Sequence, residues 1–317
     1  MGARFRLAYR VERSVPVEDE RASETDGRPG PDLTRAQAVP APGFQFNRQQ
    51  LVSAVLEAAL GDGLPSTQVA ALAKDRKRPL VVIAAAPKSG STYLANTLRH
   101  ITGLLPFRLS SAYSTNEHDL FLPALCLANA NGCISKLHIK GSYHNAALMR
   151  TFDVKPILLV RRIEDAVFSL VHDLRRKAQI PQSATGEEGY SFVWLDDNTK
   201  NLSDERLLDL VIDLAVPWFV NFYVSWYRLC EQGAVDALWL TYEQMLVDTE
   251  ATVRQALAFL GFRNVGAIDP GLLKRRYATF RDGRIGQGAS MLSAKQRRRI
   301  REQFAHYPGV DFSRYGL

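Results

Sequence analysis

Residues 81–100, VVIAAAPKSGSTYLANTLRH, decide the fold class of this chain. The stretch begins with an apolar, β-branched run that is typical of a strand buried on both faces of a parallel sheet. A turn of small residues follows, Pro-Lys-Ser-Gly-Ser-Thr, and leads into a helix-like segment. A strand that turns directly into a helix presents free backbone N–H groups and the positive end of the helix dipole at one point. The sequence therefore predicts an anion site around Lys88.

The alternation of strand and helix continues along the rest of the chain. Apolar runs at 155–160 and 236–242 are typical of further buried strands, and the segments 164–177 and 249–261 are typical of helices. Such alternation indicates an α/β fold in which a central, mostly parallel sheet is flanked by helices.

Composition divides the 317 residues into a tail and one domain. Residues 15–45 are rich in Pro, Gly, Ser and charged residues and poor in large apolar ones, so we expect residues 1–45 to form a mostly disordered tail. Residues 46–317 are predicted to form a single domain. Within it, residues 178–202 lack periodicity and contain three aromatic residues, which makes them a candidate lid over the substrate.

Charge and cysteine content narrow the partners and the compartment. The formal net charge of +7 suits an acidic partner or simply a basic surface. Basic residues are scattered among acidic ones without interleaved aromatics, which argues against nucleic-acid binding, and the run 295–301 is interpreted as a solvated helix face. Three cysteines without metal-type spacing predict free thiols, no zinc site and a reducing, cytoplasmic compartment.

No segment is predicted to cross a membrane or to direct export. The first 20 residues contain no apolar run of signal-peptide length. The most apolar long stretch, 207–229, is interrupted by Asp209, Asp213, Pro217 and Asn221, so we expect a buried helix pair there.

The phosphate loop lacks two parts of a nucleoside-triphosphate site. The Walker pattern G-x-x-x-x-G-K-[ST] places Lys after the last Gly, whereas Lys88 precedes Gly90. Neither ILLVRR nor LWLTYE supplies, at the end of its strand, the Asp that would hold Mg²⁺. A site that neutralises an anion with Lys, Arg and backbone suits the transfer of a group with less charge than a γ-phosphate, such as sulfuryl.

The segment PKSGSTYL, 87–94, resembles the P-K-S-G-T-T-W loop of sulfotransferases that use 3′-phosphoadenosine 5′-phosphosulfate (PAPS) as donor. Ser91 and Tyr93 replace the first Thr and the Trp of that pattern. The resemblance implies a P-loop-like architecture, PAPS as donor and no metal. It also implies that the 5′-phosphosulfate is bound by Lys88, Ser89, Gly90, Ser91, Thr92 and Tyr93.

A second segment, LVRRIEDAVFSLVHDL at 159–174, resembles the family's 3′-phosphate motif. Arg161 and Ser169 keep the family's spacing, and Asp165 keeps the acid between them. An Arg at the end of a strand can grip a phosphate with paired donors, and the Ser adds a hydroxyl.

Two further matches support this resemblance. WLTYEQ, 239–244, resembles the family's strand–Tyr-Glu-Asp segment, with Gln244 in place of Asp, and implies that Tyr242 faces the adenine. FRDGRIGQG, 280–288, resembles the R-K-G-x-x-G-x-W loop. That pattern is kept at Arg281, Gly283 and Gly286 and departs at Asp282 and Gly288.

Transfer also needs a base that removes the acceptor's proton. SKLHIKG, 135–141, resembles the family's K-T-H-L strand, which makes His138 that base and places Lys136 beside the sulfuryl group. By the same resemblance, Lys88 stabilises the leaving phosphate oxygen and Ser169 holds or releases it. Glu117 is the alternative base, or else an N-terminal acid of the helix that follows it.

The sequence thus predicts a PAPS-dependent sulfotransferase that moves a sulfuryl group to a hydroxyl or amine of a small or medium-sized acceptor. Two other functions stay open at this point. A nucleotide-dependent kinase with a degenerate phosphate loop is one, and activity that requires Mg-ATP would favour it. A non-catalytic nucleotide-binding protein is the other, suggested by the departures at Asp282 and Gly288.

Overall fold

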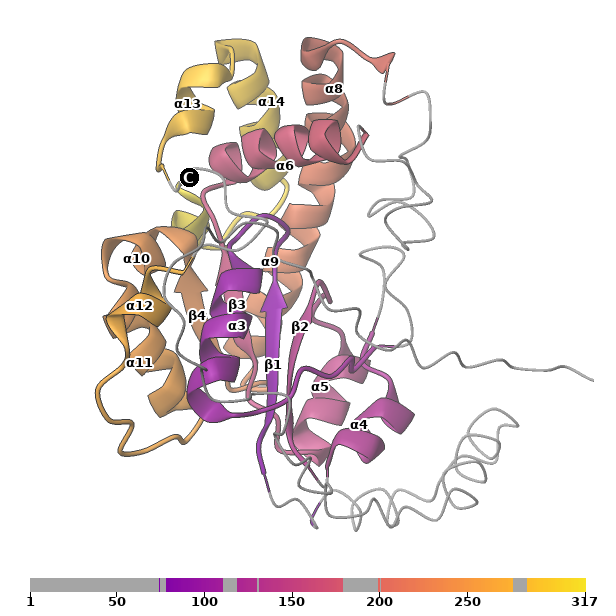
Figure 1. The fold of residues 1–317 in the computed structure, drawn as a ribbon. Helices are drawn as coiled ribbons and strands as arrows, with labels where there is room; N and C mark the ends of the chain where they lie inside the picture. Colours follow the sequence, from indigo (N-terminus) through magenta and orange to yellow (C-terminus); the bar gives the residue numbers. More distant parts are fainter. Residues whose placement is uncertain are drawn as a thin grey trace, which may run out of the picture. The chain divides into compact units, whose positions relative to one another are not determined.

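A computed structural model describes residue 74 and residues 78–110, 119–129, 131–178, 199, 201–275 and 284–317. The predicted tail and almost all of the predicted lid lie outside these residues, so both stay predictions. The described strands form one parallel sheet in the order β2-β1-β3-β4, which confirms the predicted α/β fold. In chain order the strands are β1 (Leu80–Ala85), β2 (Cys133–Leu137), β3 (Ile157–Val160) and β4 (Leu238–Thr241) (Figure 1).

Helices connect these strands and continue beyond the last one. The sequence predicts a helix directly after the phosphate loop and further helices at 164–177 and 249–261. These are present as α3, α6 and α11. The described helices up to β4 are α3 (Ser91–Thr102), α4 (Leu122–Asn129), α5 (Tyr143–Thr151), α6 (Ile163–Ala178), α8 (Asp204–Leu210), the π-helical turn η3 (Val211–Ala215) and α9 (Val216–Glu231). Those after β4 are α10 (Tyr242–Val247), α11 (Thr249–Phe259), α12 (Pro270–Leu273), α13 (Gln287–Met291), α14 (Ala294–Ala305) and the short 3₁₀ turn η4 (Ser313–Tyr315).

Strand β1 is buried along its whole length because both faces of the sheet are covered. Val81 and Ile83 point into a cluster shared with α3, α10 and α11, and Val82 and Ala84 point into a larger cluster shared with α5, α6, α9 and α14. This is why the strand reads as a continuous apolar run rather than an alternating one.

The strand order creates a switch point at the carboxyl ends of β1 and β3. The chain passes from β1 to β2 on one side of β1, and then crosses to β3 on the other side. In open α/β sheets ligands bind at such a point, where the connections diverge. The loop that follows β1 opens at this edge of the sheet (Figure 1).

The apolar stretch predicted as a helix pair is instead one run of helix from α8 through η3 to α9. The N–H of Val216 donates to the carbonyl of Val211, five residues back, just before Pro217. Proline has no N–H to continue the α-helical pattern, so a π-helical turn bridges the two parts. By length and composition this helix could cross a membrane, but 61% of its apolar window is buried within the fold, as in a core helix.

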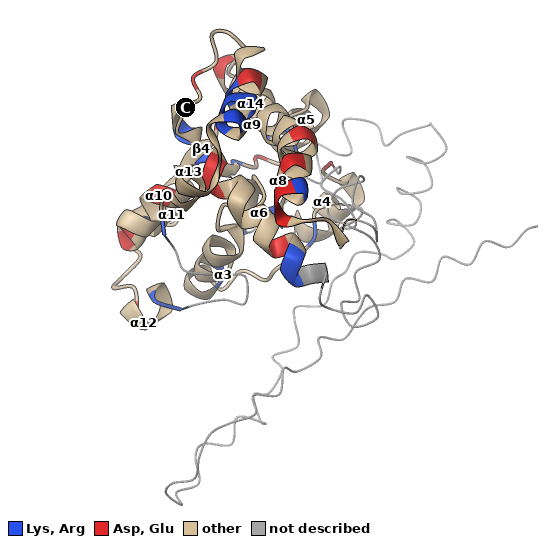
Figure 2. Ribbon diagram, turned by 90° about the horizontal axis from the view of Figure 1, so that it is seen from above, with Lys and Arg blue, Asp and Glu red and all other residues tan. Residues whose placement is uncertain are grey.

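Helix α14 contains the basic run that was interpreted as a solvated face, and this holds for only part of it. Arg298 and Arg301 are exposed, but Ile300 is fully buried. Arg299 forms ion pairs with Asp209, at 2.6 Å, and with Asp213. Figure 2 shows the basic residues on α14 and the acidic residues on α8. Part of the basic run therefore binds α14 to α8 and η3 through ion pairs.

Helix α13 packs against the first turn of α6 at very close range. Asp165 is 1% exposed, and its carboxylate accepts hydrogen bonds from the N–H groups of Gly286, at 2.8 Å, and Gly288, at 2.7 Å. A Cβ on Gly288 would lie 2.1 Å from the carbonyl oxygen of Glu164. Glycine is therefore required at 288, where the family pattern has Trp.

Replacing Asp165 tests this contact. Asp165→Asn places an amide donor where a carboxylate accepts two N–H groups, and we expect it to lower the free energy of unfolding by about 1–3 kcal/mol. Urea denaturation followed by circular dichroism measures the change. Glu164→Gln, one residue earlier and half-buried, is the matched control and should stay within about 0.5 kcal/mol of wild type. Equal effects of the two substitutions would contradict this assignment.

The three cysteines are free, as predicted, and two of them are buried. Burial raises the pKa of Cys126 to about 11 and that of Cys133 to about 12, and it also raises the pKa of Cys230. A thiol reacts through its thiolate, and at pH 8 a pKa of about 11 leaves about one thiol in a thousand ionised.

We expect an aromatic disulfide reagent at pH 8 to modify at most one thiol of the native protein rapidly, and all three in urea. Absorbance of the released thiolate counts the reactive groups. A Cys230→Ser variant identifies the fast thiol, because it should show none in the native state. Rapid labelling of Cys126 or Cys133 in that variant would contradict the burial argument.

Candidate active site

The loop between β1 and α3 has an unusual backbone. Lys88 and Gly90 both have positive φ angles, 65° and 84°. The hydroxyl of Ser89 donates to the carbonyl of Ala86 at 2.6 Å and closes the turn. A Cβ on Gly90 would lie 2.8 Å from the ring of Tyr242, so only glycine fits there. For Lys88, which is not a glycine, a positive φ costs about 1–3 kcal/mol of conformational free energy, and such strain concentrates at functional sites.

The N-terminus of α3 is left open to a ligand. Its N-cap is Gly90, which makes no side-chain cap, and its first turn carries no acidic residue. The helix N–H groups and the positive end of the dipole are therefore not neutralised locally. Other helices are capped by a side chain at Ser142, Ser203, Thr241, Asp248 and Ser293. The contrast supports the anion site that the sequence predicts.

Arg161 follows β3 and is buried beside the loop. Its Nη1 donates to the carbonyl of Lys88 at 3.3 Å, and its guanidinium carbon lies 4.3 Å from the ring centroid of Tyr242. Its Nε is buried and has no hydrogen-bond partner among the described residues. A buried donor without a partner is costly, so a donor nitrogen held in this way fits an anionic ligand that would complete its bonding.

The ammonium group of Lys88 is paired with a carboxylate that the motif does not include. Its Nζ lies 3.2 Å from Oδ1 of Asp173, which also accepts a hydrogen bond from Arg176 at 2.9 Å. Ser169 lies one turn before Asp173 on α6 and is half-buried. Residues four apart share one face of a helix, so the predicted Ser169 and the unpredicted Asp173 stand on the same side. The i, i+4 spacing was the available signal for Asp173.

His138 follows β2 directly and lies beside the end of β1. Its Nδ1 is 2.7 Å from the carbonyl oxygen of Ala85. A carbonyl can only accept, so Nδ1 carries the proton of the neutral ring, and Nε2 is the basic nitrogen. Lys136 comes two residues earlier, and because side chains alternate along a strand both residues point to the α3 side of the sheet. The structure thus brings the predicted base to the phosphate loop.

The segment after β4 contacts the residues that follow β3. Gln244, which replaces the family's Asp, forms a reciprocal capping box with Thr241 at the start of α10. Glu243 accepts a hydrogen bond from the backbone N–H of Arg162 at 3.1 Å, and burial raises the pKa of its carboxyl. Tyr242 packs on Arg161, while its predicted contact with adenine stays a prediction.

Other predicted site residues have structural contacts or fall outside the described chain. Tyr93 donates its hydroxyl to the carbonyl of Leu273 at 2.7 Å, and Ser91 is buried at the start of α3. Glu117, Arg281 and Gly283 lie outside the described residues, so their roles stay predictions. Among the described residues no group of three His, Cys, Asp or Glu side chains could hold a metal.

Comparison with solved structures found matches that include the following two. The mouse sulfotransferase SULT7A1, in a crystal structure complexed with PAP, is 18% identical, and the match covers 78% of this chain and 90% of the mouse chain with a TM-score of 0.50. A sulfotransferase from Alicyclobacillus acidocaldarius is 16% identical, with 76% and 99% of the two chains covered and a TM-score of 0.36. No curated protein sequence matches the chain. The mouse structure shows that the fold is shared.

The family model described as Sulfotransferase domain matches residues 78–303. The match begins just before β1 and ends within α14, so it contains the loop of Lys88, the strand ends that carry His138 and Arg161, and the helix that carries Ser169. The chain therefore belongs to the sulfotransferase family and is a sulfuryl-transfer enzyme, as its loop and its arginine–serine motif predict.

Proposed function

We propose that the enzyme takes its sulfuryl group from PAPS and passes it to a hydroxyl or amine of a small or medium-sized acceptor, in the cytoplasm. The observation that carries the donor assignment is Arg161, whose buried Nε lacks a partner at the switch point of the sheet. A nucleotide with a 3′-phosphate supplies such a partner. The mouse protein of similar fold was crystallised with PAP, which supports the same class of donor. The free, largely buried cysteines support a reducing compartment.

The residues of the loop hold the 5′ end of the donor in this proposal. PAPS, when bound, supplies the sulfuryl group and a phosphate oxygen as leaving group. The uncapped N–H groups of α3 and the ammonium of Lys88 neutralise charge on that oxygen as the bond from sulfur to it breaks. Arg161 and Ser169 grip the 3′-phosphate and set the orientation of the nucleotide.

His138 acts on the acceptor. Its Nε2 takes the proton of the acceptor hydroxyl while the acceptor oxygen forms its bond to sulfur, and the hydrogen bond from Nδ1 to Ala85 stabilises the imidazolium that results. The charge balance is simple, because one proton moves to His138 and one negative charge moves to the leaving oxygen beside Lys88. Such positioned acid–base catalysis contributes about 10²–10⁴-fold to a rate.

Lys88 exchanges one anion for another in this scheme. Asp173 holds the ammonium at 3.2 Å in the structure, and the side chain of Asp173 is 13% exposed. An incoming phosphate competes with that carboxylate for the same group. The pair thus keeps the cation compensated before the donor binds, since an isolated, largely buried charge is costly.

The donor assignment is tested by calorimetric binding of adenosine 3′,5′-bisphosphate and of ATP, each with and without Mg²⁺. We expect the bisphosphate to bind without metal and Arg161→Ala to weaken it by about tenfold or more, because charge-assisted hydrogen bonds to the 3′-phosphate are lost. Arg150→Ala, an exposed arginine on α5, is the control and should bind as wild type does. Preference for Mg-ATP would overturn the proposal in favour of a kinase.

The base is tested with His138→Asn, whose amide can still donate to the Ala85 carbonyl but cannot take a proton. We expect transfer from labelled PAPS, to the best substrate in a panel of phenols, alcohols and amines, to fall about 10²-fold or more. Calorimetry should show bisphosphate binding close to wild type. The exposed His306→Asn is the matched control. Full transfer by His138→Asn would exclude His138 as the base and direct attention to Glu117.

A further inference from the structure

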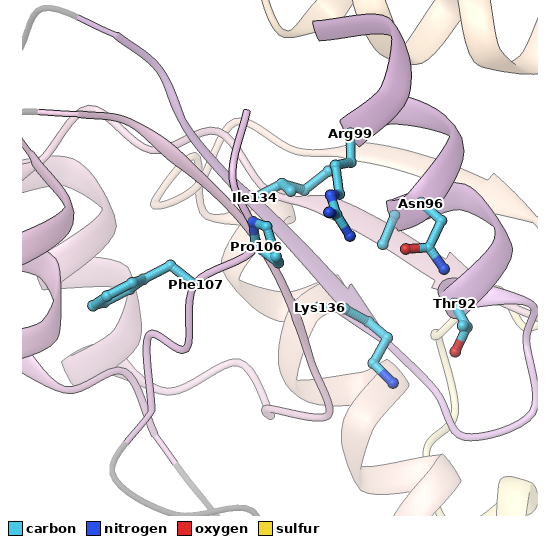
Figure 3. A pocket seen from close by; sticks show the side chains of 8 residues that line it. Thr92, Asn96, Arg99, Pro106, Phe107, Ile134 and Lys136 are labelled. Atoms are coloured by element: carbon cyan, nitrogen blue, oxygen red, sulfur yellow. The ribbon is translucent and has the colours of Figure 1, made fainter. Parts of the chain in front are cut away.

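A hollow of about 170 Å³ lies between α3 and β2, beside the phosphate loop and open to solvent. Figure 3 shows that Thr92, Asn96 and Arg99 project from α3 toward the strand that carries Lys136. The rest of its wall is apolar. Those apolar lining residues are Ala95, Pro106, Phe107 and Ile134.

Local structure explains why these side chains meet. Thr92, Asn96 and Arg99 are spaced i, i+4, i+7 and so follow one face of α3. The backbone of 105–107 is held against the free edge of β2, because Phe107 N–H donates to the Ile134 carbonyl at 3.1 Å and Ile134 N–H donates to Leu105 at 3.0 Å. The hollow is therefore framed by regular hydrogen-bonded structure on both sides.

The charge of the lining has one sign. Arg99 and Lys136 both border the hollow, and none of the described lining residues is acidic. Arg99 is exposed and forms no ion pair within the described part of the chain. Its guanidinium offers paired donors of the geometry that suits a carboxylate or a sulfate, and the Asn96 amide adds another donor.

The hollow begins at the phosphate loop. Thr92 belongs to the phosphate loop motif, and Lys136 precedes His138 by two residues on the same side of the sheet. Arg99 lies seven residues along α3 from Thr92, which at about 1.5 Å per residue is about 10 Å. One end of the hollow is thus lined by Thr92 of the phosphate loop and by Lys136, two residues before His138, and the other end carries Arg99.

We propose that this hollow binds the acceptor, and that the acceptor carries an anionic oxygen group, carboxylate or sulfate, which Arg99 binds about 10 Å along α3 from Thr92 of the phosphate loop. The body of such an acceptor lies over Pro106 and the adjoining apolar wall. Lys136 stands at the reacting end. This inference rests on the proposed function, because it places the acceptor oxygen next to a bound donor and His138.

The test is acceptor binding to the complex of the enzyme with adenosine 3′,5′-bisphosphate, which cannot react. The probes are 3-(4-hydroxyphenyl)propanoate, its methyl ester and the corresponding propanesulfonate, and binding is followed by calorimetry or ligand-observed NMR. We expect wild type to bind at least one anionic probe about tenfold more tightly than the ester, since the ester cannot form the charge-assisted pair. Comparison of the propanoate with the propanesulfonate, whose three oxygens mimic those of a sulfate, then identifies the preferred anion.

Three variants locate the preference. Arg99→Gln, at an exposed helix position, should abolish the difference between anion and ester, and Arg99→Lys should restore part of it because the charge returns without the fork. Arg150→Gln is the matched control: like Arg99 it is an exposed arginine in the last turn of a helix, but α5 packs on the opposite face of the sheet. It should keep the full preference.

Failure of this inference can be separated from failure of the donor assignment, because bisphosphate binding is measured on the same samples. If the bisphosphate binds but wild type binds anion and ester equally, or binds neither, the acceptor inference is overturned while the donor site stands. Retention of the preference in Arg99→Gln also overturns it. If the bisphosphate itself does not bind, the proposed function fails and the acceptor inference fails with it.

Discussion

Two hydrogen bonds to the backbone around the phosphate loop support the site. The carbonyl of Ala85 is bonded to His138 from β2, and the carbonyl of Lys88 is bonded to Arg161 from β3. Both neighbours of β1 in the sheet thus hold the segment that leaves it. The positive φ of Lys88 is sustained by these contacts, and the same contacts place His138 and the guanidinium of Arg161 on the two sides of the loop.

One face of helix α6 contacts both the segment at 286–288 and Lys88 of the phosphate loop. Asp165, Ser169 and Asp173 are spaced by four residues, so their side chains follow one side of the helix. Asp165 holds the N–H groups of the segment at 286–288, and Asp173 holds the ammonium of Lys88. Ser169, between them, is the residue expected at the 3′-phosphate. One rigid element therefore connects the C-terminal segment, the donor site and the loop lysine.

The two cationic side chains of the site differ in their partners. Lys88 has a carboxylate beside it, whereas the Nε of Arg161 has no partner among the described residues. An anionic ligand that reaches both groups would replace Asp173 beside Lys88 and would give the Nε of Arg161 an acceptor. The hollow along α3 differs, because it is lined by Arg99 and Lys136 and by no acidic residue among those described.

The sequence by itself determined the fold class, three of the four strands and the phosphate loop, because a buried parallel strand is apolar throughout and a phosphate loop needs small residues at a strand-to-helix turn. Strand β2, which contains Ser135 and Lys136, is predicted only through the resemblance of SKLHIKG to a strand of the family. Only the tertiary structure decided the features that depend on contacts between distant parts of the chain or on local rearrangement of hydrogen bonds. The partner of Lys88, the requirement for glycine at 288 and the unbroken helix across Pro217 all depend on neighbours distant in sequence or on hydrogen bonds that the chain rearranges around one residue. The charged hollow belongs to the same class, since Arg99 and Lys136 are 37 positions apart and only the packing of α3 beside β2 brings them to one surface.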